Sequence, residues 1–302
     1  LCVMFRAYYV GITQTKILTV NSIVMLLSNV ALNYCLIFGK GGFPAAGIAG
    51  AAIASSVSEA VSLLFFIIYT SMTADKRKYG FRRAFTLRPH LLKGMLSISG
   101  WTMVQSFISV SIWFIFFLAI EHLGERPLAV TNIVRNISAL LIMVISAFAT
   151  TAGALISNQI GAGEQRCLFK TCGMTLKLTY AILIPLLIIL CLFPEPVLRA
   201  FTDSPSLIAA SVNSVYVMAS STLIMAPSFI LFNAVSGTGN TRAGFIMEMI
   251  SLAVYTAVIY YGIIRLKPDV ALCWFSEHVY GVTLIFLAWW YLKSGKWRGK
   301  KV

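Results

Sequence analysis

The chain consists mostly of long apolar runs separated by short polar stretches. A membrane-spanning α-helix needs about 20 predominantly apolar residues, and eight runs reach that length: 17–39, 47–72, 95–120, 128–159, 174–193, 207–235, 243–264 and 270–292. The runs are continuous and lack the alternation of apolar and polar residues that marks the strands of a transmembrane barrel. The pattern therefore predicts an all-α integral membrane protein with eight transmembrane helices.

Composition and charge agree with a membrane location. The 302 residues are 59% hydrophobic and 11% charged, whereas soluble domains carry roughly a quarter charged residues. When the loops are assigned alternately to the two sides, 18 of the 24 Lys and Arg residues fall on one side, which the positive-inside rule makes cytoplasmic. We therefore expect a multi-pass protein of the inner (cytoplasmic) membrane with a cytoplasmic C-terminus. The basic loops suit anionic lipid headgroups, so nucleic-acid binding is not expected.

The chain also matches itself. An offset of 226 aligns "GITQTK" (11–16) with "GTGNTR" (237–242), and an offset of 218 then aligns "SEAV" with "SEHV". The change of offset falls in a glycine-rich connector between two predicted helices. Segment 1 thus repeats as segment 7, which predicts two parallel halves of six spans, with four further spans upstream of this chain. The repeat also makes Glu59 the counterpart of Glu277.

Four motifs resemble those of the multidrug and toxic compound extrusion (MATE) transporters. In chain order they are "LNYCLIFGKGGFPAAGIAGAAIAS" (32–55), "LGERPLAVTNI" (123–133), "SNQIGAGE" (157–164) and "SGTGNTR" (236–242). The resemblance implies a twelve-helix antiporter with two six-helix lobes, which exports amphipathic, often cationic, small molecules in exchange for sodium ions or protons. We expect a monomer in the lipid bilayer with no cofactor besides the transported ion.

By the same resemblance, three regions follow one another along the chain. They are the last two helices of a first lobe (1–72), a basic cytoplasmic linker (73–94) and a complete second lobe with a basic cytoplasmic tail (95–302).

Two charged residues lie at the same depth in different segments. Arg135 and Glu277 each stand seven residues inside the outer boundary of their segment, which corresponds to roughly 10 Å of helix. An unpaired charge at that depth is costly, so we expect the two to form an ion pair or to face one water-filled cavity. The pair is either a static lock or a cation-coupling site centred on Glu277. Asn132, Asn136 and Met143 share the helix face of Arg135 and are further cavity candidates.

Two other acids are candidates for cation coupling. Glu59 lies near the middle of the second run, and its partner is expected to come from the upstream helices. Glu248 lies five residues from the cytoplasmic end of the seventh run, where snorkelling to the interface is the favoured interpretation. The sodium-coupled branch of the family usually has acids in the third and sixth of these segments, but 95–120 and 207–235 contain none. Sodium coupling of that type is therefore in doubt.

Uncharged residues supply the remaining candidates. Gln105, Ser106, Ser109 and Trp113 form an uncharged stripe on the third segment that suits either an amphipathic ligand or helix packing. Pro227 lies inside the sixth segment and is a hinge candidate, with a static kink as the alternative.

Other classes of function fit the sequence less well. An enzyme would need a cluster of catalytic groups, and the three histidines are far apart. The six cysteines are scattered and predict neither a disulfide framework nor a metal site. A lipid-linked oligosaccharide flippase of similar architecture is the nearest alternative, although its cavity would carry several basic residues and only Arg135 lies in a span here. A purely structural membrane protein would not explain the repeat or the buried acids.

Overall fold

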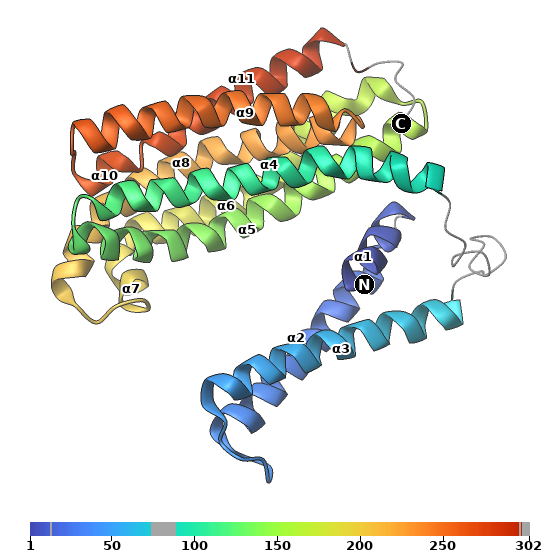
Figure 1. The fold of residues 1–302 in the computed structure, drawn as a ribbon, viewed down its shortest axis with the longest axis horizontal. Helices are drawn as coiled ribbons and strands as arrows, with labels where there is room; N and C mark the ends of the chain where they lie inside the picture. The colour runs from blue at the N-terminus through green and yellow to red at the C-terminus, as the bar shows by residue number, and fades with distance from the viewer. Residues whose placement is uncertain (13, 74–88, 296, 298–302) are drawn as a thin grey trace. The chain divides into compact units, whose positions relative to one another are not determined.

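The computed structural model describes residues 1–12, 14–73, 89–295 and 297, and all regular structure in these residues is helical (Figure 1). Eight helices are long and apolar enough to cross a membrane, as the hydrophobic pattern predicts. The chain divides into two compact units, Leu1–Pro89 and His90–Val302. Most of the expected linker, and the end of the expected basic tail, lie outside the described residues.

The first unit is a helical hairpin with a short helix beside it. Its elements are α1 (Cys2–Gly11), α2 (Lys16–Phe38) and α3 (Gly47–Thr73). The two long helices approach closely at Gly50, where an added Cβ would lie 2.5 Å from the carbonyl oxygen of Leu36. Farther along the hairpin, Asn21 of α2 is buried and donates a hydrogen bond to Ser62 of α3 at 2.8 Å. Small side chains and buried polar pairs hold many membrane helices together in this way.

The second unit contains six of the eight candidate spans. Its elements are α4 (Pro89–Glu121), α5 (Glu125–Gly161), η2 (Gln165–Cys167), α6 (Leu168–Leu192), α7 (Pro194–Arg199), α8 (Pro205–Gly237), α9 (Thr241–Val258), η3 (Ile259–Arg265), α10 (Val270–Cys273) and α11 (Ser276–Ser294). Helix α8 is central, because it packs against α5, α6, α9 and α11. Helix α4 joins this bundle through side chains such as Phe116, which is fully buried.

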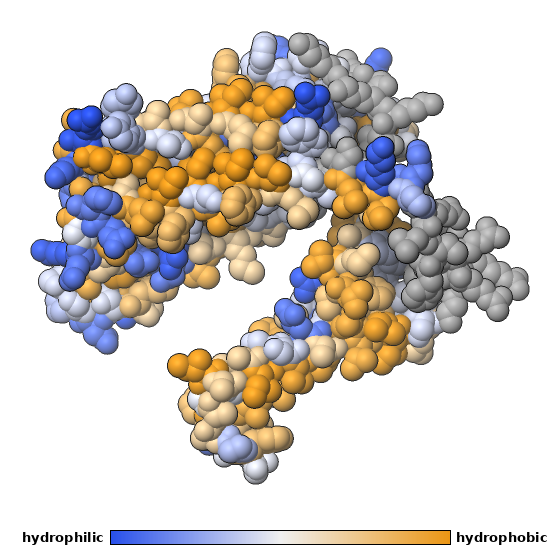
Figure 2. Space-filling model, in the orientation of Figure 1, coloured by the Kyte–Doolittle hydropathy of each residue, from blue (hydrophilic) through white to orange (hydrophobic). Residues whose placement is uncertain are grey.

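The outer surface of the second unit suits a lipid environment. Figure 2 shows an apolar band over its helices, with hydrophilic residues gathered toward the helix ends. Helix α9 contributes exposed apolar side chains at intervals of four residues, Ile246, Ile250 and Val254. A continuous exposed apolar surface is what contact with lipid tails requires.

Glycines set the close crossing of α5 and α8. An added Cβ on Gly237 would lie 2.5 Å from the carbonyl oxygen of Gly153, and one on Gly153 would lie 2.9 Å from the carbonyl oxygen of Asn233. These atoms are backbone, so they cannot move aside as a side chain could. The two helices that carry much of the bundle's core therefore meet backbone to backbone.

The last predicted span differs from the structure. The pattern predicts one helix over 270–292, but α10 ends at Cys273 and α11 begins at Ser276. The predicted membrane span is confirmed as Val270–Ser294, but its helix is interrupted at Trp274 and Phe275, which the apolar pattern does not predict. The residues at the break, Trp274 and Phe275, are both aromatic, so hydropathy alone cannot reveal it. Trp274 is buried and packs edge-on against Phe116 of α4, with 5.7 Å between ring centroids.

Pro227 lies inside α8 without ending it. Proline has no N–H, so the carbonyl four residues earlier loses its helical partner. That carbonyl belongs to Leu223, and the hydroxyl of Tyr180 on α6 donates a hydrogen bond to it at 2.7 Å. A side chain of a neighbouring helix thus satisfies the acceptor that the proline frees. The role of Pro227 as a hinge stays a prediction.

Replacing Tyr180 by phenylalanine is expected to lower the free energy of unfolding by about 1 kcal/mol, because the freed carbonyl of Leu223 loses its donor. Thermal unfolding of the purified protein in detergent measures the loss. Tyr216→Phe is the control, since Tyr216 lies on the same α8 and is exposed. Equal stability of the Tyr180→Phe and Tyr216→Phe proteins would show that the hydrogen bond contributes nothing.

Candidate functional site

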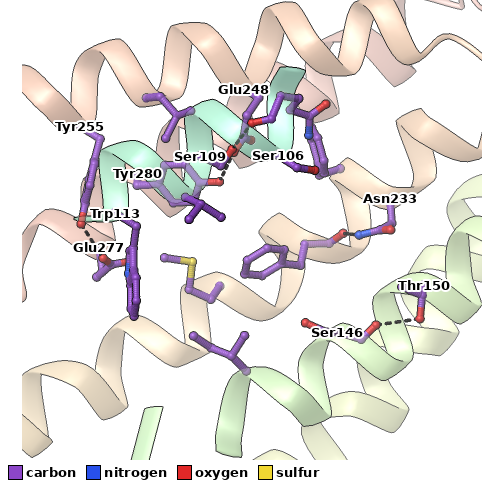
Figure 3. Close-up of a pocket in the computed structure, with 17 residues that line it drawn as sticks. Ser106, Ser109, Trp113, Ser146, Thr150, Asn233, Glu248, Tyr255, Glu277 and Tyr280 are labelled. Carbon is purple, nitrogen blue, oxygen red and sulfur yellow. Dashed lines mark hydrogen bonds between the residues drawn. The ribbon is translucent and has the colours of Figure 1, made fainter. Parts of the chain in front are cut away.

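The second unit contains an open cavity of about 490 Å³. Five helices line it, α4, α5, α8, α9 and α11, and Figure 3 shows their side chains converging on it. The polar lining residues are Gln105, Ser106, Ser109, Ser146, Thr150, Asn233, Glu248, Tyr255, Glu277 and Tyr280. The apolar and indole-bearing ones are Val110, Trp113, Ile142, Met225, Phe229, Phe232 and Leu252. Apolar walls with a few convergent polar groups are typical of small-molecule sites.

Two carboxylates line this cavity, that of Glu248 on α9 and that of Glu277 on α11. Each accepts a hydrogen bond from a tyrosine on the other of these two helices. The hydroxyl of Tyr255 on α9 donates to Oε1 of Glu277 on α11 at 2.8 Å. The hydroxyl of Tyr280 on α11 donates to Oε1 of Glu248 on α9 at 2.9 Å. Each helix therefore supplies one acid and one phenol, and the two hydrogen bonds run in opposite directions between them.

The spacing along each helix explains why these groups meet. Glu248 and Tyr255 are seven residues apart on α9, and Glu277 and Tyr280 are three residues apart on α11. Both separations bring side chains to one face of an α-helix. The two tyrosine rings pack edge to face, with 5.8 Å between their centroids. We name this set of four residues the acid–tyrosine cluster.

Glu248 is buried rather than exposed at the membrane surface. The residue is 4% exposed, and the hydroxyl of Ser109 on α4 lies 3.0 Å from the same Oε1 that Tyr280 contacts. Its other oxygen, Oε2, has no hydrogen-bond partner in the part of the chain that the structure describes. The expectation that Glu248 snorkels to the cytoplasmic interface is therefore wrong, because its side chain points into the bundle toward α4 and α11.

Arg135 does not pair with Glu277. Its guanidinium lies over the ring of Phe117 at 5.3 Å and over that of Trp113 at 5.9 Å, while Glu277 is bound to Tyr255. The predicted ion pair is wrong, because aromatic faces on α4 contact the cation in place of the carboxylate. Arg135 also does not line the cavity, although Trp113 does.

The other candidates on α5 lie outside the cavity as well. The side-chain amide of Asn132 donates to the backbone carbonyl of Leu128 in its own helix at 3.1 Å. Asn136 is exposed, and Met143 is 73% exposed. Met143 is not among the residues that line this cavity, where α5 contributes Ile142 instead, so its role as a cavity residue stays a prediction. A sequence pattern gives the spacing along a helix, but it does not give the rotation of the helix in the bundle.

The predicted stripe on α4, unlike the candidates on α5, lines the cavity. Gln105, Ser106, Ser109 and Trp113 all lie in the cavity wall. Ser109 lies 2.9 Å from the backbone carbonyl of Gln105 as well as close to Glu248. The structure thus brings this stripe and two of the three proposed coupling acids into one cavity. Contact of the stripe with a ligand stays a prediction.

Glu59 is the third coupling candidate and belongs to the first unit. It is exposed and lines a separate cavity of about 410 Å³, together with Arg6. Under the offset of 218, its neighbour Ser62 corresponds to Tyr280. Both Ser62 and Tyr280 form a hydrogen bond to the preceding long helix of their unit. The two contacts are similar but not equivalent, because the offset of 226 aligns Asn21 with Met247, whereas Tyr280 bonds to Glu248. The partner expected for Glu59 from upstream helices stays a prediction.

Tyr255 and Tyr280 are among the site residues that the sequence analysis missed, together with Ser146, Thr150 and Asn233. A signal for the two tyrosines exists, because each stands at helical spacing from an intramembrane acid on its own helix. Tyrosine is one of the few side chains that combine a large apolar ring with a hydrogen-bond donor for a buried carboxylate. A tyrosine at such spacing therefore lies on the same helix face as the acid, where it can donate to a carboxylate of a neighbouring helix.

The cluster can hold a positive charge in two ways. A carboxylate that accepts one hydrogen bond keeps further lone pairs for a proton or for a bound cation. Protonation would neutralise the same oxygens that attract a cationic ligand, so binding of one opposes binding of the other.

Comparison with known proteins identifies relatives of this arrangement. A family model described as MatE matches residues 102–261. The chain is 25% identical over 316 residues to a probable multidrug resistance protein NorM of Thermotoga maritima, covering 99% of this chain and 64% of that protein. It is 25% identical over 264 residues to an uncharacterized transporter YisQ of Bacillus subtilis, covering 83% of this chain and 55% of that protein.

Solved structures show the same fold. One is a multidrug resistance MATE family transporter of the MOP superfamily in an outward-facing conformation, with a TM-score of 0.79 and 16% identity over 91% of this chain and 62% of that one. Another is the Vibrio cholerae MATE transporter VcmN in the bent form, with a TM-score of 0.77 and 13% identity over 97% of this chain and 66% of that one. The chain spans less than two thirds of the length of both curated relatives described above.

Proposed function

The chain belongs to the MatE family, and on that premise we propose that the protein is a secondary active antiporter. It exports amphipathic, often cationic, small molecules in exchange for protons or sodium ions, as a multi-pass protein of the inner membrane with a cytoplasmic C-terminus. The coupling acids that we propose are Glu248 and Glu277. We further propose that the protein works as a monomer, since no step of this exchange requires a second copy.

The observation that carries this proposal is the acid–tyrosine cluster inside an amphipathic cavity. Two carboxylates attract a cation, and Trp113, Phe229 and Phe232 offer apolar and π surfaces to its organic part. A lipid-linked oligosaccharide carries phosphate, which this acid-lined cavity would repel. The cavity therefore favours the antiporter over the flippase.

The proposed exchange follows from competition at the carboxylates. With Glu248 and Glu277 ionised, the cavity binds an organic cation. Arrival of two protons, or of two sodium ions, on the side of higher concentration neutralises the two carboxylates and releases the ligand. Alternating access then requires that the cavity open to one side of the membrane at a time. Tyr255 and Tyr280 act as positioning residues, because their hydroxyls fix the carboxylate oxygens that exchange the ion.

The test is counterflow in proteoliposomes, with the protein expressed from its complete reading frame. A fluorescent aromatic cation is followed under an imposed proton gradient and, separately, a sodium gradient. We expect Glu248→Gln and Glu277→Gln each to reduce ion-driven exchange by at least about tenfold, the loss of roughly one charge-assisted interaction. The wild-type response to the two gradients tells which ion drives the exchange.

Glu125→Gln serves as the matched control, because Glu125 is an exposed acid at the start of α5. It should exchange like the wild type. If Glu248→Gln and Glu277→Gln both transported at the wild-type rate across pH 5 to 9 and across sodium concentrations, neither acid would couple transport to an ion. The proposal would then be wrong.

A further inference from the structure

We infer that the cavity contains a second recognition subsite, formed by Ser146 and Thr150 of α5 and Asn233 of α8, for an uncharged hydroxyl or N–H group of the transported ligand. The inference rests on the proposed function and deepens it. The ligand class it specifies is an amphipathic cation that carries a hydrogen-bonding group separated from its charge by an apolar body. We name the three residues the polar subsite.

The polar subsite lies apart from the carboxylates. Ser146, Thr150 and Asn233 belong to α5 and α8, whereas the acid–tyrosine cluster belongs to α9 and α11, and all of them line one cavity. Figure 3 shows the three side chains on the other side of the cavity from Tyr255 and Glu277. No formal charge is present among them, so they add nothing to the attraction for the cationic centre.

The hydrogen bonds already present define what the polar subsite can still bind. The hydroxyl of Thr150 donates to backbone carbonyls one turn earlier, 2.8 Å from that of Ser146 and 3.1 Å from that of Ala147. Its single hydrogen is therefore committed, and only its oxygen lone pairs remain. Thr150 can consequently bind a donor of the ligand and cannot bind an acceptor.

Asn233 and Ser146 extend this capacity. The amide nitrogen of Asn233 donates to the backbone carbonyl of Phe229 at 2.9 Å, which fixes the orientation of the amide because a carbonyl only accepts. Oδ1 and one amide hydrogen then remain for a ligand. The hydroxyl of Ser146 has both roles. A ligand hydroxyl can donate to Thr150 and accept from Ser146 or Asn233 at once, which a methyl group cannot do.

Apolar side chains join the two ends of the cavity. Met225, Phe229 and Phe232 lie on the cavity side of α8, and Ile142 lies one turn from Ser146 on α5. A ligand that touches both the carboxylates and the polar subsite must place an apolar body against these residues. The volume of about 490 Å³ is within the range of pockets for drug-sized ligands.

The expected consequence is discrimination between two otherwise identical cations. A site with committed hydrogen-bonding groups disfavours an analogue that leaves them unpaired. Because water can reach an open cavity and replace part of the lost contact, we expect a preference of about fivefold to tenfold for the hydroxyl-bearing cation, the usual effect of one or two neutral hydrogen bonds.

The experiment uses two aryl-alkyl quaternary ammonium probes that differ only at the chain end, a hydroxymethyl group in one and an ethyl group in the other. Binding is measured by quenching of intrinsic tryptophan fluorescence, and exchange by counterflow in proteoliposomes. We expect the wild type to prefer the hydroxyl probe by about fivefold to tenfold. Thr150→Val, and independently Ser146→Ala, should bring this ratio close to one.

Thr151→Val is the matched control. Thr151 makes the same kind of bond, 2.8 Å to the carbonyl of Ala147, but it does not line the cavity, so its variant should keep the wild-type ratio. Equal affinity of wild type for the two probes, or an unchanged ratio in both Thr150→Val and Ser146→Ala, overturns the inference while exchange itself continues. A hydroxyl preference in binding without ion-driven exchange overturns the proposed function alone. Binding of neither probe overturns both.

Discussion

Removing both hydroxyl groups beside Glu248, with Ser109→Ala and Tyr280→Phe in one protein, is expected to lower the free energy of unfolding by about 3 kcal/mol at neutral pH. Glu248 is 4% exposed, and these two hydroxyls are the groups that lie within hydrogen-bond distance of its Oε1. Without them an ionised carboxylate would stay in the bundle with no donor. For a chain of 302 residues the loss corresponds to a fall in melting temperature of roughly 5 °C.

The pH dependence of this loss identifies its cause. The donors stabilise the ionised carboxylate, so their contribution is present where Glu248 is ionised and disappears as the pH falls and the carboxyl takes up a proton. The double variant should therefore differ most from the wild type at neutral and alkaline pH. Thermal unfolding at one scan rate, measured from pH 4 to pH 8, shows the trend.

A third change provides the control. Adding Glu248→Met to the double variant removes the charge and keeps the volume approximately, so stability should recover most of the loss. If the triple variant were as unstable as the double variant, the loss would come from packing of Tyr280 and Ser109 and not from an uncompensated carboxylate.

Gly237→Ala is expected to destabilise the protein by about 3 kcal/mol, the upper part of the usual range for overpacking. The new Cβ would lie 2.5 Å from the carbonyl oxygen of Gly153, and only a shift of the α5 backbone against α8 could relieve the contact. Gly153→Ala should act in the same direction, because its Cβ would lie 2.9 Å from the carbonyl oxygen of Asn233. Thermal unfolding in detergent measures both.

Gly173→Ala is the matched control for this prediction. Gly173 is interior to α6, and an added Cβ there would meet no atom of the described residues within 4 Å. Because glycine weakens a helix interior relative to alanine, this variant should be unchanged or more stable by up to about 1 kcal/mol. A loss of similar size at Gly173 and Gly237 would indicate that the close crossing is not responsible.

The fold could be predicted from the sequence to the level of its spans. All eight apolar runs are helices, since a bilayer demands long apolar segments whose backbone groups bond within the segment. The break between α10 and α11 could not be predicted, because Trp274 and Phe275 are as apolar as the residues around them. A turn in such a run depends on tertiary packing, here that of Trp274 against Phe116.

The site was harder to predict than the spans. The depth of a residue in the membrane follows from counting residues along its helix. That count identified Glu277, Arg135 and Glu248 as charged residues within predicted spans. The direction in which each side chain points cannot be predicted from this count. A helix that is apolar on nearly all sides gives no indication of how it is rotated about its axis in the bundle. Arg135 consequently meets aromatic rings, and Glu248 faces its neighbours instead of the membrane surface.

The crossed hydrogen bonds between α9 and α11 also limit how these helices can move. The contacts Tyr255–Glu277 and Tyr280–Glu248 lie about two turns apart on α9. A single contact would allow one helix to swivel about it, whereas two separated contacts resist rotation of either helix about its own axis. Through any conformational cycle that leaves both bonds intact, α9 and α11 must travel as one rigid body, and the motion must be taken up where this body meets α4, α5 and α8.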